Sequence, residues 1–364
     1  MNELDRNTQT ITALLEDLFE IGAIYHQHPN MIFSLNFRYE KKKSLKFIND
    51  RLKTAGYKYT LNVRDDVLLL NIDPRPRITI PILNIVLFIA TLFTVYFVPV
   101  FIRQLGLAPT FSEAFRKTLD ALAAGAGIEF TVAMVSILFV HEMGHFIASR
   151  RRNIITSWPY FIPAPNIIGT FGAIIKSKSP FWNRRDLIEV GAAGPIAGWV
   201  VAIGWLLYGL SQSALLPQGA FGPADLVFSM EGESIIMRLA TLSIIGPAPD
   251  GFFYNLTEAA FAGWVGLLVT AINMLPIGQL DGGHVIYGLA RRRQHILGKL
   301  ATAGLIIFGF QSTMWWFFAA FGLFFGMSHP PTLDDTRPLE RSAVVMGWIA
   351  LMILILSFTP MPFR

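Results

Sequence analysis

Two histidines and a glutamate lie close together in an apolar stretch of the chain, at His141, Glu142 and His145. Residues four apart share one face of a helix, so the two imidazoles would point the same way with a carboxylate beside them. This spacing is typical of a site that binds a divalent metal and holds a general base next to it. A pair of histidines that only hydrogen-bond to neighbouring helices is the alternative, and this pattern alone leaves it open.

A catalytic zinc takes three protein ligands and keeps a fourth position for water, so a third ligand is expected elsewhere. The chain has no cysteine, which leaves histidine, aspartate and glutamate as candidates. Asp281 is favoured because it ends an apolar segment at the expected depth of His141 and His145, and the Gly-Gly pair after it permits close backbone approach. The neighbouring His284 is a weaker candidate, and Asp281 could instead be a helix-terminal carboxylate that faces water.

The composition is that of a membrane protein. Of 364 residues, 53% are hydrophobic and 15% are charged, whereas roughly 25% charged residues is usual in soluble domains. The formal net charge is +5, but the basic residues cluster beside apolar runs, where they mark cytoplasmic loops, and we therefore expect no nucleic-acid partner. The acidic N-terminus lacks the basic start and apolar core of a secretory signal, so we expect the first eighty residues or so to stay cytoplasmic.

Six apolar segments are long enough to cross a hydrocarbon core of about 30 Å. They begin with the uncharged stretch between Arg77 and Arg103 and continue with residues 130–149, 190–210, 259–280, 300–327 and 343–363. The fifth is long for one helix and short for two, and a turn at residues 311–313 would raise the number of spans to seven. Arginine clusters at 150–152, 184–185 and 291–293 place their loops on the cytoplasmic side.

The sequence therefore predicts a polytopic α-helical membrane domain, residues 79–364, preceded by a small soluble α+β domain, residues 1–78. After an amphipathic first helix, the N-terminal domain is expected to form a β-α-β-β unit with strands at Met31–Arg38, Tyr57–Arg64 and Val67–Ile72 and a helix at Lys41–Ala55. Nothing in this domain has a catalytic or nucleotide-binding pattern. A role in docking a partner or regulating access is the weaker hypothesis for it.

The segment Tyr160–Ser179 is rich in proline and glycine and too short to cross the membrane as a helix. It should dip into the membrane as a re-entrant β-hairpin and return, which is tolerated only where the backbone is buried in protein or lines a wet cavity. A hairpin here implies an active-site chamber. Farther along, Gly194 and Gly198 form a GxxxG pair that permits close helix packing, which we interpret as scaffold.

Taken together, these motifs resemble the site-2 proteases, peptidase family M50, which are zinc metalloproteases that cut substrates within the membrane. The resemblance rests on residues 141–145, on "GTFGAII" at 169–175, on "GAAGPIAG" at 191–198, and on Asn273, Pro276, Leu280, Asp281 and Gly282. It covers about residues 130–290, and the segments "HPPTLDD" and "FTPMPF" near the C-terminus are similar to the bacterial and plastid branch with an N-terminal extension.

The resemblance implies an intramembrane zinc endopeptidase with one Zn²⁺ held by His141, His145 and Asp281, and with Glu142 as the catalytic base. By the same resemblance Asn273 assists the oxyanion, although a helix-packing hydrogen bond explains it as well. The hairpin edge, formed by Gly169, Thr170, Phe171, Gly172 and Ala173, would pair with an unwound substrate segment as an added strand. A packed interfacial loop without substrate contact is the alternative for this edge.

The expected substrates are transmembrane proteins of the same bilayer, most simply single-pass ones. The expected location is a bacterial cytoplasmic membrane, with a plastid membrane as the alternative, and the active site and N-terminal domain face the cytoplasmic side. The loop at residues 211–258 is too short for the PDZ domain that some relatives carry. The competing functions are a membrane metal transporter, whose His/Glu pair would lie on an ion path, and a non-proteolytic relative that binds transmembrane helices.

Overall fold

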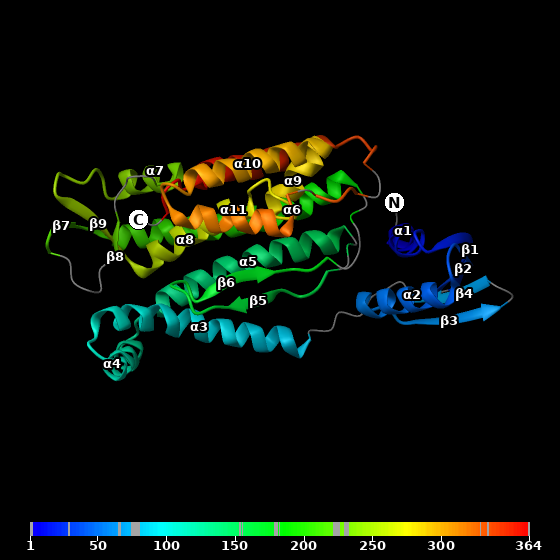
Figure 1. Ribbon diagram of the computed structural model, residues 1–364, viewed down its shortest axis with the longest axis horizontal. Helices are drawn as coiled ribbons and strands as arrows, with labels where there is room; N and C mark the ends of the chain where they lie inside the picture. The colour runs from blue at the N-terminus through cyan, green and yellow to red at the C-terminus, as the bar shows by residue number, and fades with distance from the viewer. Residues whose placement is uncertain are drawn as a thin grey trace.

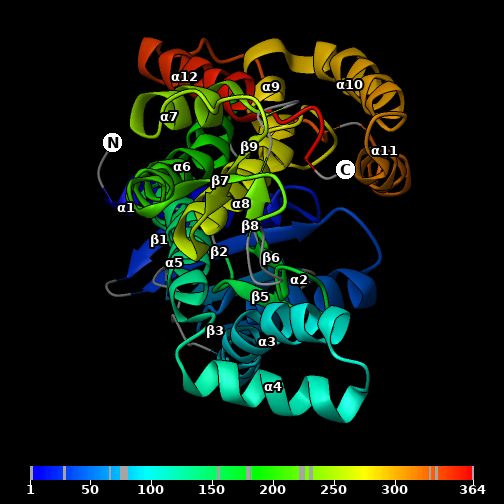
Figure 2. The same ribbon diagram turned by 90° about the vertical axis from the view of Figure 1, so that its left-hand side faces the viewer.

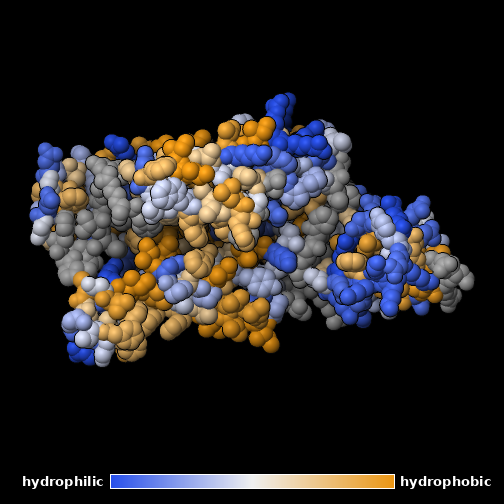
Figure 3. Space-filling model, viewed as in Figure 1, coloured by the Kyte–Doolittle hydropathy of each residue, from blue (hydrophilic) through white to orange (hydrophobic). Residues whose placement is uncertain are grey.

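The computed structural model describes residues 3–27, 30–64, 67–73, 81–152, 154, 156–177, 181, 183–220, 226–228, 233–327, 329–332 and 335–362. Figure 1 shows a long bundle of roughly parallel helices, with a small α/β unit beyond one end of it. In the space-filling view, hydrophobic residues form much of the bundle surface and hydrophilic residues cover the small unit (Figure 3). This contrast is expected when one part faces lipid and the other faces water.

The N-terminal unit is a four-stranded antiparallel sheet with two helices. Its elements are α1 (Glu3–Leu15), β1 (Phe19–Gln27), β2 (Asn30–Phe37), α2 (Lys41–Ala55), β3 (Tyr59–Arg64) and β4 (Val67–Ile72). The strand order is β1-β2-β4-β3, and the unit has its own apolar core, which includes Ile11, Phe33, Leu52 and Leu70. The predicted β-α-β-β unit was wrong by one strand: β1 was missed, because its Gly22 and polar ends interrupt the alternation that marks the other strands.

Within the part of the chain that the structure describes, three helices are long and apolar enough to cross a membrane: α3 (Ile82–Leu107), α5 (Ile128–Arg151) and α6 (Arg184–Gln212). Helices α5, α6 and α8 (Glu258–Asn273) pack together in the middle of the bundle, and Figure 2 shows α3 and α4 (Phe111–Ala123) to one side of them, away from α10 (Gln294–Phe308) and α12 (Arg341–Ser357). The main apolar core lies among these central helices and includes Phe130, Leu206 and Trp264.

The fifth apolar segment is divided into two helices, α10 and α11 (Thr313–Phe325), by a turn at residues 309–312. The turn contains Gln311 and Ser312 of the predicted turn at 311–313, and Thr313 begins α11. The two helices have 15 and 13 residues, or about 22 and 20 Å at 1.5 Å per residue. Each alone is therefore short for a hydrocarbon core of about 30 Å.

The loop between α6 and α8 forms a small cap of three strands and one helix. These are β7 (Ala214–Pro217), β8 (Leu226–Phe228), α7 (Ile235–Ile244) and β9 (Phe252–Leu256), with strand order β7-β9-β8. Beside them the indole of Trp264 donates a hydrogen bond of 2.8 Å to the carboxylate of Glu233. Burial raises the pKa of the Glu233 carboxyl to about 7, although this hydrogen bond opposes the shift.

The predicted hairpin is present as β5 (Tyr160–Pro163) paired with β6 (Thr170–Ile174). It is fastened to α3, because the buried amide of Asn84 donates to the carbonyl oxygens of Trp158 and Pro159 at 3.0 and 2.8 Å, and Phe88 packs edge-on against Phe161. Figure 1 shows the hairpin running between α3 and α5. These contacts anchor the β5 side of the hairpin to α3.

Candidate active site

Three candidate ligand atoms lie at the corners of a nearly equilateral triangle. The Nε2 atoms of His141 and His145 are 3.2 Å apart, and they lie 3.3 and 3.2 Å from Oδ2 of Asp281. Both imidazoles are buried, with 4% and 8% of His141 and His145 exposed. Two elements distant in the sequence, α5 and the start of α9 (Asp281–Ala290), supply these atoms.

The hydrogen bond on the far side of His145 decides what its ring presents to the other two residues. Nδ1 lies 2.7 Å from the carbonyl oxygen of Val190. A carbonyl only accepts, so Nδ1 must carry a proton, and the neutral ring then turns the lone pair of Nε2 toward His141 and Asp281. A lone pair facing a carboxylate is unfavourable unless a cation lies between them, and backbone support of this kind is usual for metal-binding histidines.

The triangle has the size that zinc requires. With metal–ligand bonds of about 2.0–2.1 Å, two ligands of a tetrahedral zinc lie about 3.3 Å apart, and the three separations are 3.2–3.3 Å. Two imidazole nitrogens and one carboxylate oxygen are also a donor set that zinc accepts, with a fourth position for water. The residues present therefore fit a catalytic zinc ion.

Small residues on α6 make room for the two imidazoles. A Cβ atom added to Gly194 would lie 2.1 Å from Nε2 of His145, and one added to Gly198 would lie 2.9 Å from Cβ of His141. On α5, a Cβ at Gly144 would lie 2.6 Å from the carbonyl oxygen of Ala193. The GxxxG pair does permit close packing, as predicted, and it also gives the ligands the space that they occupy.

Asp281 begins a helix and does not end one, so the prediction that it ends the fourth span was wrong. Helix α8 stops at Asn273, and residues 274–280 form a turn before α9 starts at Asp281. Pro276, which lacks an N–H group, and Gly278, with a φ of +51°, break the apolar segment here. The carboxylate nevertheless reaches the two histidines, with Oδ2 at 3.3 and 3.2 Å from their Nε2 atoms.

One cavity of about 190 Å³ connects the predicted catalytic residues. It is lined by the three candidate ligands together with Glu142, Asn273 and His284, and it has room for several water molecules. Glu142 follows His141 on α5 and lines the cavity, with 4% of its surface exposed. His284 lines the cavity but is not part of the ligand triangle, and its Nδ1 donates to the carbonyl oxygen of Leu280 at 2.9 Å.

The predicted hairpin edge is only partly next to this cavity. Ala173 lines it, together with Ile174, Ile175 and Ser177, which lie beyond the predicted substrate-binding edge. Gly169 faces away, since a Cβ there would lie 2.5 Å from Cα of Val95 on α3. Thr170 is buried and bonds within the hairpin, Phe171 is 68% exposed, and Gly172 has open space around its Cα.

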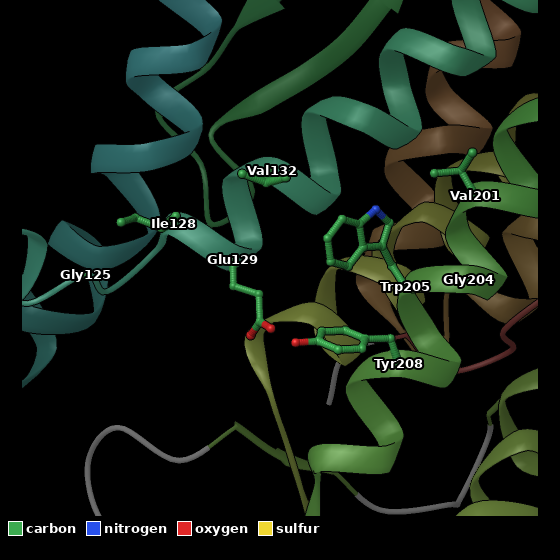
Figure 4. A pocket seen from close by; sticks show the side chains of 8 residues that line it. All are labelled: Gly125, Ile128, Glu129, Val132, Val201, Gly204, Trp205 and Tyr208. Atoms are coloured by element: carbon green, nitrogen blue, oxygen red, sulfur yellow. The ribbon is translucent and has the colours of Figure 1, made fainter.

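A larger hollow, of about 870 Å³, lies near the other end of α5 and α6. Figure 4 shows that its side chains come from these two helices, with Glu129 pointing into it between Ile128 and Tyr208. Among the described residues that line this hollow, Glu129 is the one carboxylate, and none is a histidine. The chemistry therefore favours the smaller cavity as the candidate active site.

The sequence analysis missed the backbone partner of His145. The Val190 carbonyl leaves no signal in the residue type, because every residue carries a backbone carbonyl group. The cavity-lining residues Ile174, Ile175 and Ser177 were within reach, since they continue the hairpin past Ala173. If the predicted strand had been continued past Gly172 as far as Ser177, it would have included them.

Residues 129–315 match the family model described as Peptidase family M50. Among curated proteins, the chain is 28% identical over 372 residues to a rice (Oryza sativa subsp. indica) protein described as "Probable zinc metalloprotease EGY2, chloroplastic". It is 30% identical over 244 residues to "Probable zinc metalloprotease EGY1, chloroplastic" of Arabidopsis thaliana. No solved structure matches the chain.

The two alignments cover different shares of the proteins. The first covers 97% of this chain and 66% of the rice protein. The second covers 65% of this chain and 43% of the Arabidopsis protein. The chain thus spans less than two thirds of the length of these relatives.

Proposed function

Since the chain belongs to peptidase family M50, we propose that it is an intramembrane zinc endopeptidase that hydrolyses peptide bonds within or near transmembrane segments of membrane proteins. One observation carries the proposal: the triangle of His141, His145 and Asp281 opens into a cavity that Glu142 and Asn273 also line. The relatives described as zinc metalloproteases support the same activity.

Each residue has a separate part in this reaction. Zinc held by His141, His145 and Asp281 would polarise the peptide carbonyl and acidify a water molecule. Glu142 accepts a proton from that water as its oxygen bonds to the carbonyl carbon, and it returns the proton to the amine nitrogen as the C–N bond breaks. Asn273 donates a side-chain N–H to the oxyanion in the tetrahedral state.

The substrate is proposed to be a transmembrane segment that unwinds and adds to the free edge of β6. In the described residues β6 pairs with β5 alone, and Ala173 and Ile174 of β6 line the same cavity as the candidate ligands. Pairing would satisfy the N–H and C=O groups that unwinding exposes inside the membrane. A photo-crosslinking residue placed at Phe171, which is 68% exposed, should form a crosslink to the substrate. Failure to form any crosslink to a substrate that is cleaved would contradict this arrangement.

We propose six or seven spans, with the N-terminal unit and the active site toward the cytoplasmic side of a bacterial or plastid membrane. The arginines that end α5 and follow α9 support this orientation. The described relatives are chloroplastic. The orientation can be measured by adding a protease to sealed right-side-out vesicles that contain the protein with an N-terminal tag. The tag should be protected inside the vesicles, and its cleavage from outside would contradict the proposed orientation.

The direct test compares wild type with Glu142→Gln in detergent, using single-span substrates. The change keeps the shape of the side chain but removes the base, so we expect zinc to be retained by both proteins and cleavage by wild type alone. Equal cleavage by both would assign the activity to a contaminant. Loss of zinc from the variant would show that Glu142 holds the metal and is not simply a base.

A further inference from the structure

The turn that carries Asp281 is packed with its carbonyl groups facing inward. A Cβ atom at Gly282 would lie 1.9 Å from the carbonyl oxygen of Met274, and one at Gly283 would lie 2.2 Å from that of Gly278. The turn therefore rests directly on the first residues of α9. Because it lies at membrane depth, its carbonyls need donors that water does not supply.

Gln294, the first residue of α10, supplies such a donor. Its side chain is fully buried, with 0% exposed, and its Nε2 donates at 3.0 Å to the carbonyl oxygen of Pro276, in the middle of the turn. One helical turn later, a Cβ atom at Gly298 would lie 2.9 Å from the same carbonyl oxygen. The Pro276 carbonyl is thus held in a slot on α10.

The same amide also binds the segment that follows α11. Nε2 of Gln294 donates to the carbonyl oxygen of Met327, and Oε1 accepts from the backbone N–H of His329, both at 3.0 Å. The N–H of Gly278 donates to the Met327 carbonyl as well. Both N–H groups and the oxygen of the amide are therefore used, and they join α10 to the turn at Pro276 and to the segment at residues 327–329.

We propose that Gln294 is a positioning residue for the metal centre, which holds the turn before Asp281 in place and so sets how tightly the site retains its metal. The proposal rests on the proposed function for the identity of the metal. Gln294 itself touches no candidate ligand, and it acts through the backbone of residues 276–281. Residues that orient metal ligands typically change metal affinity or activity by about 10- to 100-fold when they are replaced.

Two variants remove the hydrogen bonds in different ways. Gln294→Met keeps the approximate volume and length but loses all three bonds, and Gln294→Glu can accept from His329 but cannot donate to Pro276 or Met327. Thr302→Val is the matched control. Thr302 is also buried on α10, with 2% exposed, but it donates only to Gly298 of its own helix at 2.9 Å.

Two readouts do not depend on proteolysis. The first is the rate at which full-length protein in detergent loses zinc to a chelator, and the second is hydrogen exchange of residues 274–283 in zinc-free protein. We expect Gln294→Met and Gln294→Glu to release zinc roughly tenfold faster or more and to exchange faster in this segment, whereas Thr302→Val behaves as wild type. For substrates that are cleaved, kcat should fall with little change in KM.

The outcomes separate this proposal from the proposed function. Faster zinc release and faster exchange support the positioning role even if no substrate is cleaved. If the two Gln294 variants match Thr302→Val in both measurements, the proposal is overturned, whether or not the protein is a protease. Should the Gln294 variants fail to fold, Gly298→Ala tests the same contact, because the added Cβ would displace the Pro276 carbonyl, and unchanged zinc release in it would equally overturn the proposal.

Discussion

Substitution of Gly194 by alanine tests whether α6 sets the position of the metal ligands. An added Cβ would lie 2.1 Å from Nε2 of His145, whereas ordinary contact begins near 3.4 Å. The imidazole must therefore move by the difference, about 1.3 Å. Such a movement stretches its 2.7 Å hydrogen bond to Val190 and takes Nε2 out of the ligand triangle.

The expected cost is large in function and small in helix stability. A displacement of about 1 Å at a reacting group can lower a rate about 100-fold, so we expect at least this loss of cleavage together with a reduced zinc-to-protein ratio after dialysis. Helix propensity works in the opposite direction, because alanine is more favourable than glycine by about 1 kcal/mol. A general weakening of α6 is therefore not the expected cause of the loss.

Gly204→Ala is the matched control on the same helix, since nothing lies within 4 Å of a Cβ added there. It should retain zinc and cleave as wild type does. Zinc content is measured by elemental analysis, cleavage with a single-span substrate, and folding by thermal unfolding. If Gly194→Ala keeps a full complement of zinc and cleaves within about threefold of Gly204→Ala, then His145 tolerates the added methyl group and the reasoning fails.

Three further results are expected. Asn273→Ala should lower kcat by about 10²–10³-fold with zinc retained, as for the loss of one oxyanion donor, and an unchanged kcat would leave Asn273 with a packing role. Asp281→Asn should release zinc to a chelator much faster than wild type, because a neutral amide replaces the anionic ligand, and equal release would point to another third ligand. For Glu233, the folded pKa of about 7 lies above the ordinary value of 4.5 for a glutamate, so the folded state binds more protons between these values. Stability should therefore fall by up to roughly 3 kcal/mol as pH rises from about 4.5 to 7. Thermal unfolding of Glu233→Gln, which can still accept from Trp264, should lack this slope, and an identical slope in both proteins would contradict it.

The sequence predicted those parts of the site that depend on residue type and local spacing. His141, Glu142 and His145 are four residues apart at most, so the helix alone places them together. Asp281 was expected at the depth of the two histidines, and its Oδ2 lies 3.2–3.3 Å from their Nε2 atoms, although it begins a helix and does not end one. Its role as a metal ligand stays a prediction. A proline and a glycine signal the break between α8 and α9, but they do not show where the chain goes after it.

Other features could not be read from the sequence because they are tertiary. Gln294 looks like an ordinary polar residue at a helix start, and nothing local shows that its amide meets two distant carbonyls. The Val190 carbonyl has no side-chain signature at all. Strand β1 was missed because its local pattern is weak, and the strand is stabilised by its pairing with β2 at eight positions.

The ligand triangle joins residues 136 positions apart along the chain, from His145 to Asp281. During synthesis at the ribosome, a nascent chain that has inserted α3, α5 and α6 still lacks the third ligand. The turn that carries Asp281 is completed later still, when Gln294, Met327 and His329 have been made. The complete ligand set, with the turn held in place, is thus expected only after His329 has been made, and a product that stops before Asp281 would lack the third ligand.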